Sequence, residues 1–413
     1  MSSSTPLNST ESAPSRAEEI RHLFDRYVAP TYRRSLVLSH GSGSFVWDVD
    51  GKRYLDFGGG IAVTALGHAH PRVAQALAQQ ASRLVHVSNL FHTEPQGLLA
   101  RKLVELTGPG KVFFANSGAE SNEALFKMAR RFGQETGGRF EIITALDSFH
   151  GRTLGGISAT GQDKIKAGFG PLVPGFVHAT FNDLDAFARA ITPQTVAVMI
   201  EGIRGESGIH PATPEFLLGL RRLADQHNLL FLFDAVQCGM FRTGHFQSYE
   251  TILSEAGIDP VLARPDAISM AKSLGNGLPI GAAWFSSKVA DLLGPGSHGT
   301  TYGGSPLVCA AALEVLHTIE DENLADNVRR IGRRLRSGLE ELRAQGKPIK
   351  DVRGCGAMIG MELDRDPLEA AAQLRQAGLI LIPSGHNTLR FLPPLNATED
   401  EVALALQLIK DTL

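Results

Sequence analysis

Cysteine and long apolar runs are scarce in this sequence of 413 residues. The three cysteines (Cys238, Cys309 and Cys355) are odd in number, widely spaced and part of no metal-binding motif. We therefore expect reduced thiols that serve as small apolar side chains, with no disulfide framework and no metal site. The longest apolar stretches, such as Leu229–Phe233, are far shorter than the roughly 18 residues that a membrane-spanning helix requires.

An excess of charge of one sign is also absent. Forty Lys and Arg residues stand against 43 Asp and Glu residues, which gives a formal net charge of −3. The chain thus lacks the broad positive field that binds nucleic acid or an anionic membrane. Residues 1–15 are mostly Ser, Thr, Pro and Asn and contain no apolar segment typical of a secretory signal. We expect them to form a disordered tail, and we expect a cytoplasmic protein that binds neither nucleic acid nor membrane.

Short β-rich runs that alternate with helical stretches dominate the middle of the sequence. The runs are Lys111–Ala115, Glu141–Ala145, Thr195–Ile200, Leu229–Phe233, Ala267–Met270 and Ala282–Phe285. Helical patterns such as Glu120–Phe132 and Thr213–His227 separate several of them. Near-continuous apolar strands that alternate with helices indicate an α/β fold, with a mostly parallel sheet covered by helices on both faces.

The two chain ends have a different pattern. Near the N-terminus, Asp50-Gly51 lies between alternating apolar residues, which is typical of a β-hairpin. Near the C-terminus, a long helical region over Leu307–Arg343 precedes short strands and a final helix over Thr398–Ile409. Thr398 and Glu401 have the spacing of a helix-capping box. These elements predict a smaller α+β unit.

The length of the chain favours two or three domains, because a typical domain has roughly 100–200 residues. We predict a large α/β domain over residues 76–305. The smaller α+β domain would combine residues 16–75 with residues 306–413, so that both chain ends build it.

Candidate chemistry is expected where strands end, because open α/β sheets bind ligands at the carboxyl ends of their strands. The run Lys111–Ala115 is followed by Asn116, Ser117, Gly118 and Ala119 and then by a helix. Small residues at a helix start expose N–H groups that favour an anion such as phosphate. The alternative is an ordinary helix cap, which these residues taken alone favour.

Asp234 and Lys272 follow two further strands. Asp234 ends an apolar strand, where a carboxylate is costly to bury without a cation, and a protonated pyridine nitrogen would be such a cation. Lys272 lies between an apolar strand and the Gly275-Asn276-Gly277 run, which makes it a candidate for a lowered pKa and Schiff-base chemistry. The alternatives are a surface or helix-capping aspartate and a solvated lysine.

Three more segments add aromatic, hydroxyl and cationic groups. Phe149 and Arg152 follow a strand and offer an aromatic face beside a guanidinium, and Thr300 and Thr301 offer hydroxyls for a second phosphate contact. Arg390 is a cation in an apolar run, which indicates an anionic partner that is either a substrate carboxylate or an internal salt bridge. Together with the small residues at the helix start, Asp234 and Lys272, these groups indicate a site for pyridoxal phosphate.

The sequence resembles the class III aminotransferases of pyridoxal-phosphate fold type I, and within them the acetylornithine branch. The similarity runs from about residue 30 to the C-terminus. It is carried by the segments YLDFGGGIAVTALGHAHP, NSGAESNEALFKMAR, FHGRT, DAVQCGMFRTG, SMAKSLGNGLPIGA, GTTYGGSPL, VRGCGAMIGMEL and LRFLPPL. The resemblance implies pyridoxal 5′-phosphate as the cofactor and a homodimer with shared active sites.

The resemblance also implies roles around the cofactor ring. Lys272 would bind the cofactor's aldehyde covalently and then move a proton between substrate and cofactor. Asp234 would pair with the ring nitrogen, Val236 and Phe149 would pack on the two ring faces, and Gln237 would lie near the ring hydroxyl.

Further implied roles concern the phosphate and the substrates. The N–H groups of Gly118 and Ala119 would bind the phosphate, and Thr301 would reach it from the partner subunit. The implied substrate contacts are Arg152, Thr300, Arg390 and Glu206. Among these, Arg390 would take the α-carboxylate of glutamate, and Glu206 would be its counter-ion when the donor is not a diacid.

Some positions depart from the pattern of the family. The family usually has Asp-Glu-Val-Gln where this chain has Ala235, and Glu-Pro-Ile-Gln-Gly-Glu where it has Gly202 and Arg204. None of these changes removes a cofactor contact. Arg204 would add a charge near the expected substrate region, which leaves the identity of the substrate open.

The resemblance favours transfer of the terminal amino group of N2-acetylornithine to 2-oxoglutarate, which gives N-acetylglutamate 5-semialdehyde and glutamate, a step of arginine biosynthesis. Ornithine, succinylornithine and 4-aminobutyrate aminotransferases are alternatives, and a pyridoxal-phosphate aminomutase is a further one. A scaffold protein without activity is disfavoured because Lys272 and Asp234 are present. A dinucleotide-binding oxidoreductase is disfavoured because Gly58-Gly59-Gly60 lacks the G-x-G-x-x-G spacing.

Overall fold

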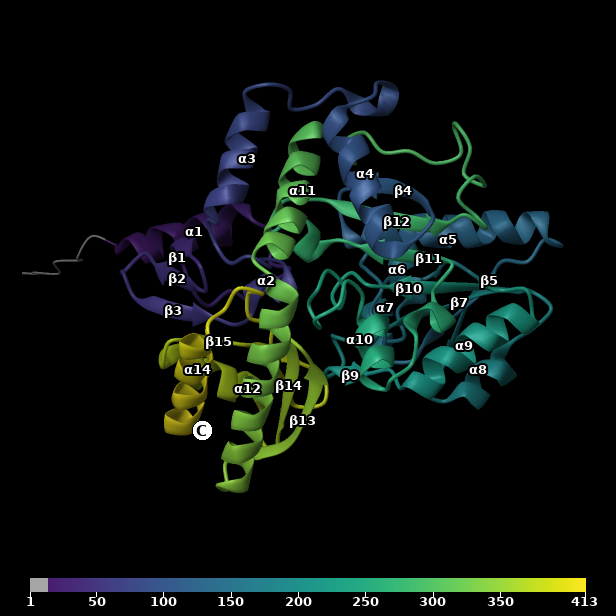
Figure 1. Ribbon diagram of the computed structural model, residues 1–413. Coiled ribbons are helices and arrows are strands. Elements are labelled where there is room, and N and C mark those ends of the chain that lie inside the picture. Colours follow the sequence, from purple (N-terminus) through teal and green to yellow (C-terminus); the bar gives the residue numbers. More distant parts are fainter. Residues whose placement is uncertain (1–13) are drawn as a thin grey trace, which may run out of the picture.

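The computed structural model describes residues 14–413, so the expected tail over residues 1–15 lies almost wholly outside the described residues. Figure 1 shows a large sheet with its helices on the right and smaller sheets on the left. The purple N-terminal and yellow C-terminal segments meet in the left-hand part. Helix α1 (Arg16–Tyr27) begins there with a capping box between Ser15 and Glu18.

The large sheet has seven strands and confirms the predicted α/β class. In spatial order they are β4 (Gly110–Ala115), β12 (Gly281–Ser286), β11 (Ala267–Met270), β10 (Leu230–Asp234), β7 (Thr195–Glu201), β5 (Glu141–Ala145) and β6 (Phe176–Ala179). Strand β12 is antiparallel to both of its neighbours, β4 and β11, and the other pairs in this sheet are parallel. The six predicted strands are all present. The sequence did not indicate β6, a short edge strand interrupted by the polar His178.

Helices cover both faces of this sheet, as the continuous apolar strands predict. Within β10, Phe231 and Phe233 pack into one core cluster, whereas Leu230 and Leu232 pack into another that contains the buried side of α5 (Gly118–Glu135). The other helices and 3₁₀ turns of this region are α4 (Glu94–Thr107), α6 (Leu154–Ala159), α7 (Asp163–Lys166), α8 (Leu184–Ala190), α9 (Pro214–Gln226), α10 (Ser248–Glu255), η1 (Ser88–Leu90), η2 (Pro260–Ala263) and η3 (Lys272–Leu274).

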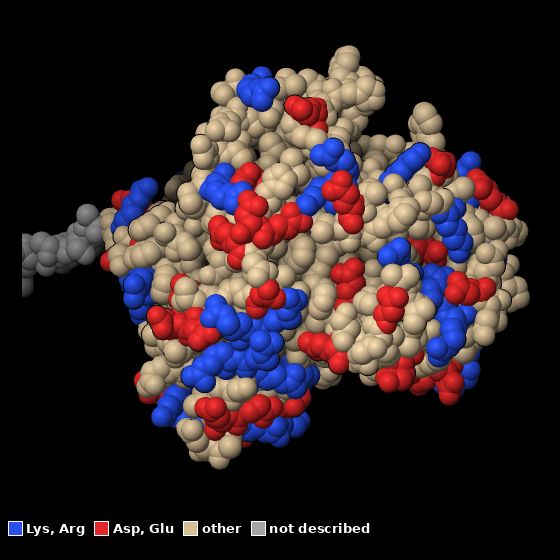
Figure 2. Space-filling view, viewed as in Figure 1, with Lys and Arg blue, Asp and Glu red and all other residues tan. Residues whose placement is uncertain are grey.

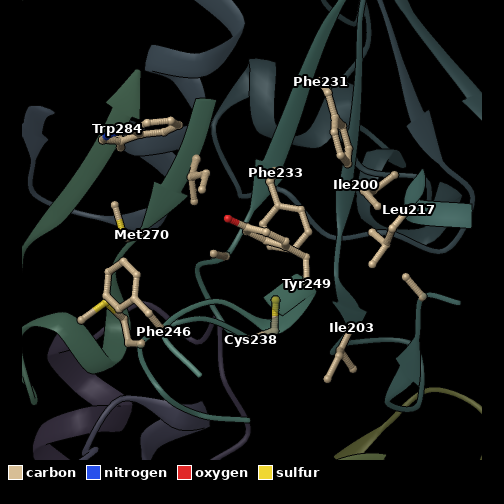
Figure 3. Packing of buried hydrophobic residues seen from close by; sticks show 14 of the residues in the cluster. Ile200, Ile203, Leu217, Phe231, Phe233, Cys238, Phe246, Tyr249, Met270 and Trp284 are labelled. Atoms are coloured by element: carbon tan, nitrogen blue, oxygen red, sulfur yellow. The ribbon is translucent and has the colours of Figure 1, made fainter. Parts of the chain in front are cut away.

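The core beneath β10 is dense and aromatic. Figure 3 shows Phe233 beside Tyr249, and their rings meet edge to face at 5.3 Å between centroids. Cys238 lies in the same cluster, and all three cysteines are unpaired thiols. This packing gives the ends of the central strands a rigid base.

The smaller sheets join the two chain ends. One has the antiparallel order β13 (Ile349–Cys355), β14 (Met358–Leu363), β17 (Thr388–Phe391) and β16 (Ile382–Ser384). Another has the order β1 (Leu38–Ser42), β2 (Phe45–Asp48), β3 (Arg53–Asp56) and β15 (Leu379–Ile380). Because β15 pairs with β3, the C-terminal segment completes a sheet that the N-terminal segment begins. The exact domain boundaries stay a prediction.

A two-stranded ribbon and further helices complete the described residues. The ribbon is β8 (Ile203–Arg204) with β9 (His210–Pro211), and the helices are α2 (Gly59–Ala62), α3 (Pro71–Ala81), α11 (Pro306–Asp321), α12 (Leu324–Ala344), α13 (Pro367–Gln376) and α14 (Glu399–Thr412). The helical region expected over Leu307–Arg343 is divided at Asn323, whose φ of +50° interrupts the α-helical geometry. Asn tolerates this left-handed conformation better than most residues.

The charged surface is mixed. Figure 2 shows acidic and basic side chains interspersed over one face, with a dense basic group where Figure 1 places the arginine-rich helix α12. None of the helices described in residues 14–413 combines the length and apolar character that a membrane crossing requires.

Candidate active site

A cavity of about 400 Å³ opens where β7, β10 and β11 end and α5 begins. This is the carboxyl edge of the parallel strands, where ligands of open α/β sheets bind. The residues that line it include Val63, Asn116, Ser117, Gly118, Ala119, Asn122, Phe149, His150, Arg152, Glu201, Asp234, Val236, Gln237 and Lys272. The structure therefore brings together most of the site residues that the sequence predicts.

The N-terminus of α5 presents unpaired N–H groups to this cavity. Ser117 caps the helix by accepting a hydrogen bond from the N–H of Glu120 at 3.2 Å. The N–H groups of Gly118 and Ala119 have no hydrogen-bond acceptor within residues 14–413. A Cβ on Gly118 would lie 2.5 Å from a methyl group of Val236, so a side chain cannot fit here without displacing the cavity wall. The geometry suits an anion held by backbone N–H groups.

Asp234 is a fixed carboxylate at the end of β10. One oxygen accepts hydrogen bonds from Asn122 Nδ2 at 2.7 Å and pairs with His150 Nδ1 at 2.8 Å, and the other accepts the N–H of Val236 at 3.0 Å. Burial alone would lower the pKa of His150, but the hydrogen bond and charge of Asp234 outweigh it and raise that pKa. The carboxylate is thus held in one orientation at the cavity wall, where it can receive a planar cation.

Lys272 follows β11 and starts a short 3₁₀ turn. Its φ of +45° is a left-handed conformation that is unfavourable for a residue with a side chain, and such strain is typical of functional positions. Burial lowers the pKa of the Lys272 amine, and the charge of Glu206 opposes that effect. The amine therefore exists more readily in its neutral, nucleophilic form than a solvated lysine.

Arg390 and Glu206 form an ion pair beside the cavity. Arg390 lies in β17, is almost fully buried, and places Nη1 2.6 Å from Glu206 Oε1. Gln237, which lines the cavity, accepts a hydrogen bond from the same Nη1 at 3.2 Å. Burial raises the pKa of Glu206, but the charge of Arg390 outweighs it, so the net shift is downward. Of the two readings of Arg390, the internal salt bridge is present in this structure.

Glu201 has a buried carboxyl group that connects the segment of Phe149 with the β8–β9 loop. It ends β7 directly opposite Asp234 on β10. Its side chain accepts the N–H of Phe149 at 3.1 Å and the N–H of Gly205 at 3.4 Å. Burial raises the pKa of Glu201 to about 7. The sequence pattern assigned no role to Glu201, because its contacts with Phe149 and Gly205 depend on the tertiary fold.

The remaining predicted residues divide into two groups. The Arg152 guanidinium lies 5.5 Å from the centre of the Phe149 ring, and both residues line the cavity. Thr300 instead accepts hydrogen bonds from Asn116 Nδ2 and the N–H of Gly303, each at 3.1 Å, and Thr301 is exposed. Neither threonine lines the cavity of its own chain within the described residues. Their roles stay predictions.

The position of Arg204 differs from the expectation that it adds a charge near the substrate. Its guanidinium donates to the carbonyl of Leu146 at 2.9 Å, lies 3.5 Å from a carboxylate oxygen of Asp147, and stacks 4.6 Å from the ring centre of Phe181. The Arg204 guanidinium therefore makes its contacts within the protein, and Arg204 is not among the residues that line the cavity.

Sequence reasoning assigned no role to Asn122 or His150, although both hold Asp234. A signal for Asn122 was present, because it lies four positions after Gly118 and so one helical turn further along the same face. No comparable local signal links His150 to Asp234, which is 84 residues away.

Residues 27–413 match the family described as aminotransferase class-III. The chain belongs to the class-III aminotransferases. It is 44% identical over 392 residues to the acetylornithine aminotransferase of Caldanaerobacter subterraneus subsp. tengcongensis, a match that covers 94% of this chain and 97% of the relative. It is 43% identical to the succinylornithine transaminase/acetylornithine aminotransferase of Pseudomonas aeruginosa, covering 96% and 97%. The solved structure of the ornithine aminotransferase from Toxoplasma gondii superposes with a TM-score of 0.90 at 32% identity, covering 96% and 94%.

Class-III aminotransferases use pyridoxal 5′-phosphate, and the cavity of this class-III aminotransferase fits that cofactor. The N-terminus of α5 offers N–H groups to a phosphate, and Asp234 offers a carboxylate to a protonated ring nitrogen. Lys272 offers an amine of lowered pKa to an aldehyde. The predictions of family, fold type, enzyme class and cofactor are thus confirmed.

Proposed function

We propose that this transaminase moves the terminal amino group of N2-acetylornithine to 2-oxoglutarate, which yields N-acetylglutamate 5-semialdehyde and glutamate. The carbon that bears the donor amine is oxidised to an aldehyde, and the keto carbon of 2-oxoglutarate is reduced as it accepts the amino group. The observation that supports this proposal most strongly is the Arg390–Glu206 pair next to the lysine cavity. One site has to accept both an amine donor and a dicarboxylic acid. The charge of Arg390 is neutralised while Glu206 is paired with it, and it becomes available to a substrate carboxylate when Glu206 moves away.

In this proposal, distinct residues hold distinct parts of the cofactor. Gly118 and Ala119 would bind the phosphate through N–H groups, and Thr301 of the partner subunit would add a hydroxyl. Asp234 would hold the protonated ring nitrogen, and Phe149 and Val236 would pack against the ring. The residues that complete the cofactor set are Gln237, near the ring hydroxyl, and Lys272. When bound, pyridoxal phosphate supplies an electron-withdrawing ring that stabilises negative charge on the substrate carbon.

Lys272 carries the proton in the proposed mechanism. In its neutral form Nζ would accept the proton from the carbon next to the substrate nitrogen and hold it for later return. The burial that lowers the pKa of Lys272 makes this neutral form more accessible than it is in a solvated lysine. Glu206 and Arg390 oppose each other in their effects on the Lys272 pKa, so the amine is sensitive to whether the ion pair is closed or open.

The other proposed substrate contacts act on carboxylates. Arg152 binds the carboxylate of the acylated donor, with Thr300 completing this contact. Arg390 binds the α-carboxylate of glutamate and 2-oxoglutarate after Glu206 moves away, because arginine binds carboxylates through paired hydrogen bonds. With the acylated amine in place, Glu206 remains on Arg390 and neutralises it. This division of labour explains two arginines with different surroundings.

The relatives support N-acetylornithine as the donor, and they also define the competing donors. The first relatives carry the name acetylornithine aminotransferase, one is also named succinylornithine transaminase, and a solved neighbour is an ornithine aminotransferase. A panel of N2-acetylornithine, N2-succinylornithine, ornithine and 4-aminobutyrate on purified, cofactor-loaded protein decides among them. We expect the highest kcat/KM for N2-acetylornithine and strict dependence on 2-oxoglutarate. Preference for another amine refutes the donor, and turnover without an oxoacid points to an aminomutase.

We also propose a cytoplasmic homodimer with shared active sites. The exposure of Thr301 outside its own chain's cavity supports the dimer, as do the exposed apolar side chains of Leu90, Phe91 and Tyr302. Light scattering on the purified protein gives the mass that tests the dimer. A monomer with full activity would contradict it.

A further inference from the structure

A short loop carries Glu206 to Arg390, and one hydroxyl group closes that loop. The loop joins β8 to β9 and turns through Gly208, whose φ is +105°. The hydroxyl belongs to Ser384, the last residue of β16. It donates to the carbonyl of Gly205 at 3.0 Å and accepts the N–H of Gly208 at 2.9 Å. These two bonds lie on either side of Glu206 and connect both ends of its turn to one atom.

The contacts around this hydroxyl connect the loop to the arginine strand. The N–H of Gly385 donates to the carbonyl of Glu206 at 3.0 Å. Strand β16 pairs with β17, so that Ser384 lies opposite Thr388, two residues before Arg390. Arg390 itself donates to the carbonyl of Gly205 at 3.3 Å. The position of the Glu206 backbone relative to the guanidinium is therefore fixed through β16.

The two members of the ion pair differ in their freedom to move. The side chain of Arg390 is 2% exposed, whereas that of Glu206 is 29% exposed. The Glu206 carboxylate is thus the member that moves away when a dicarboxylic substrate arrives. The conformation of the loop backbone determines how readily this carboxylate returns to Arg390. Removing the Ser384 hydroxyl would leave the N–H of Gly208 without its acceptor and loosen the turn.

We propose that the hydroxyl of Ser384 is a positioning group that sets how firmly Glu206 covers Arg390, and thereby sets the preference between an amine donor and a dicarboxylic substrate. Ser384 does not touch substrate in this role and acts only through the loop. The proposal rests on the proposed function in one respect, because it assumes that both kinds of substrate use the Arg390 end of the site.

The chain offers a matched control in the same loop. Ser207 is buried, and its Oγ has no hydrogen-bond partner within the described residues. Ser207→Ala removes the same atom as Ser384→Ala from a neighbouring position without removing a hydrogen bond. Ser384→Thr keeps the hydroxyl and is the conservative variant.

The test compares the two half-reactions separately on cofactor-loaded wild type, Ser384→Ala, Ser384→Thr and Ser207→Ala. For Ser384→Ala we expect the ratio of kcat/KM for glutamate to that for N2-acetylornithine to rise about fivefold, because the variant loses both neutral hydrogen bonds of the hydroxyl and only part of that loss reaches Glu206. Ser384→Thr and Ser207→Ala should stay within about twofold of wild type. An unchanged ratio in Ser384→Ala, or an equal shift in Ser207→Ala, overturns the proposal.

A binding measurement separates this proposal from the proposed function. Glutarate is an unreactive dicarboxylate, and calorimetry should show its Kd fall about fivefold in Ser384→Ala because Glu206 competes less well. If wild type uses none of the amines in the panel, the proposed function fails, yet glutarate binding still decides the role of Ser384. If Ser384→Ala folds poorly, Ser384→Cys has to shift the Kd in the same direction, since a thiol is only a weak donor and acceptor.

Discussion

The two ends of the active site are built in different ways. At the cofactor end, Asp234 and Lys272 follow neighbouring strands of one buried sheet, and Asp234 pairs in register with Ser269 three residues before the lysine. At the carboxylate end, Glu206 and Arg390 are 184 residues apart and come from a loop and from a separate antiparallel sheet. The first end is held by the sheet itself, whereas the second depends on how two sheets face each other. Rigidity at one end and adjustability at the other suit an enzyme that keeps one cofactor and exchanges two substrates.

The largest effect should come from the cofactor end. Lys272→Ala removes the amine that we propose moves the proton, so we expect kcat to fall by at least about 10³-fold in both half-reactions. Absorbance spectra of the purified variant should also lack the visible band of covalently attached cofactor. Thermal unfolding serves as the control for folding. Retained turnover, or retained covalent attachment, would contradict the assignment of Lys272.

A second large effect should follow from Asp234→Asn. The amide cannot balance a protonated ring nitrogen, so we expect kcat to fall by about 10²-fold or more in both half-reactions. The change also removes the negative charge that raises the pKa of His150, and that pKa should fall toward the value that burial dictates. NMR titration of the His150 imidazole measures this shift. An unchanged His150 pKa would refute the coupling.

A substitution at the carboxylate end should affect the two half-reactions unequally, whereas a substitution at the cofactor end should lower both. In Arg390→Gln, glutamate and 2-oxoglutarate lose a charge-assisted pair, so their KM should rise by about 10- to 100-fold. The acylated donor should be affected much less, because in the proposed function Glu206 stays paired with Arg390 while that donor is bound. Separate measurement of the two half-reactions gives the comparison, with Lys272→Ala as the variant that lowers both. Equal losses in Arg390→Gln would remove the proposed division of the site.

The same contrast explains what the sequence could predict. Asp234 and Lys272 were predictable because each follows an apolar strand, and parallel strands bring their carboxyl ends to one edge. The six predicted strands and the double covering of the sheet followed from the same short apolar runs. The partner of Arg390 was not predictable from spacing, because the sequence allowed a substrate or an internal acid and only the packing of β17 against the β8–β9 loop decides. The resemblance to the family contributed most at residues such as Glu206, whose role depends on tertiary contacts that spacing does not reveal.

Local pattern also failed where one residue changed the path of the chain. Asn323 divides a helical region because it adopts a left-handed conformation, and nothing in the apolar pattern requires this. The roles of His150 and Glu201 depend on neighbours in other strands and loops. Such contacts connect residues far apart in sequence, and no periodicity marks them.

The smallest effect should come from Arg204, whose charge the sequence places near the substrate but whose side chain packs elsewhere. Its guanidinium contacts Leu146, Asp147 and Phe181 and does not line the cavity. Arg204→Gln should therefore leave the relative kcat/KM values of the four amines within about twofold of wild type, while the lost cation–π and ion-pair contacts lower the free energy of unfolding by about 1 kcal/mol. Denaturant unfolding and the amine panel measure the two quantities. A tenfold change in donor preference would place Arg204 in the path of the substrate and extend the adjustable end of the site beyond Glu206 and Arg390.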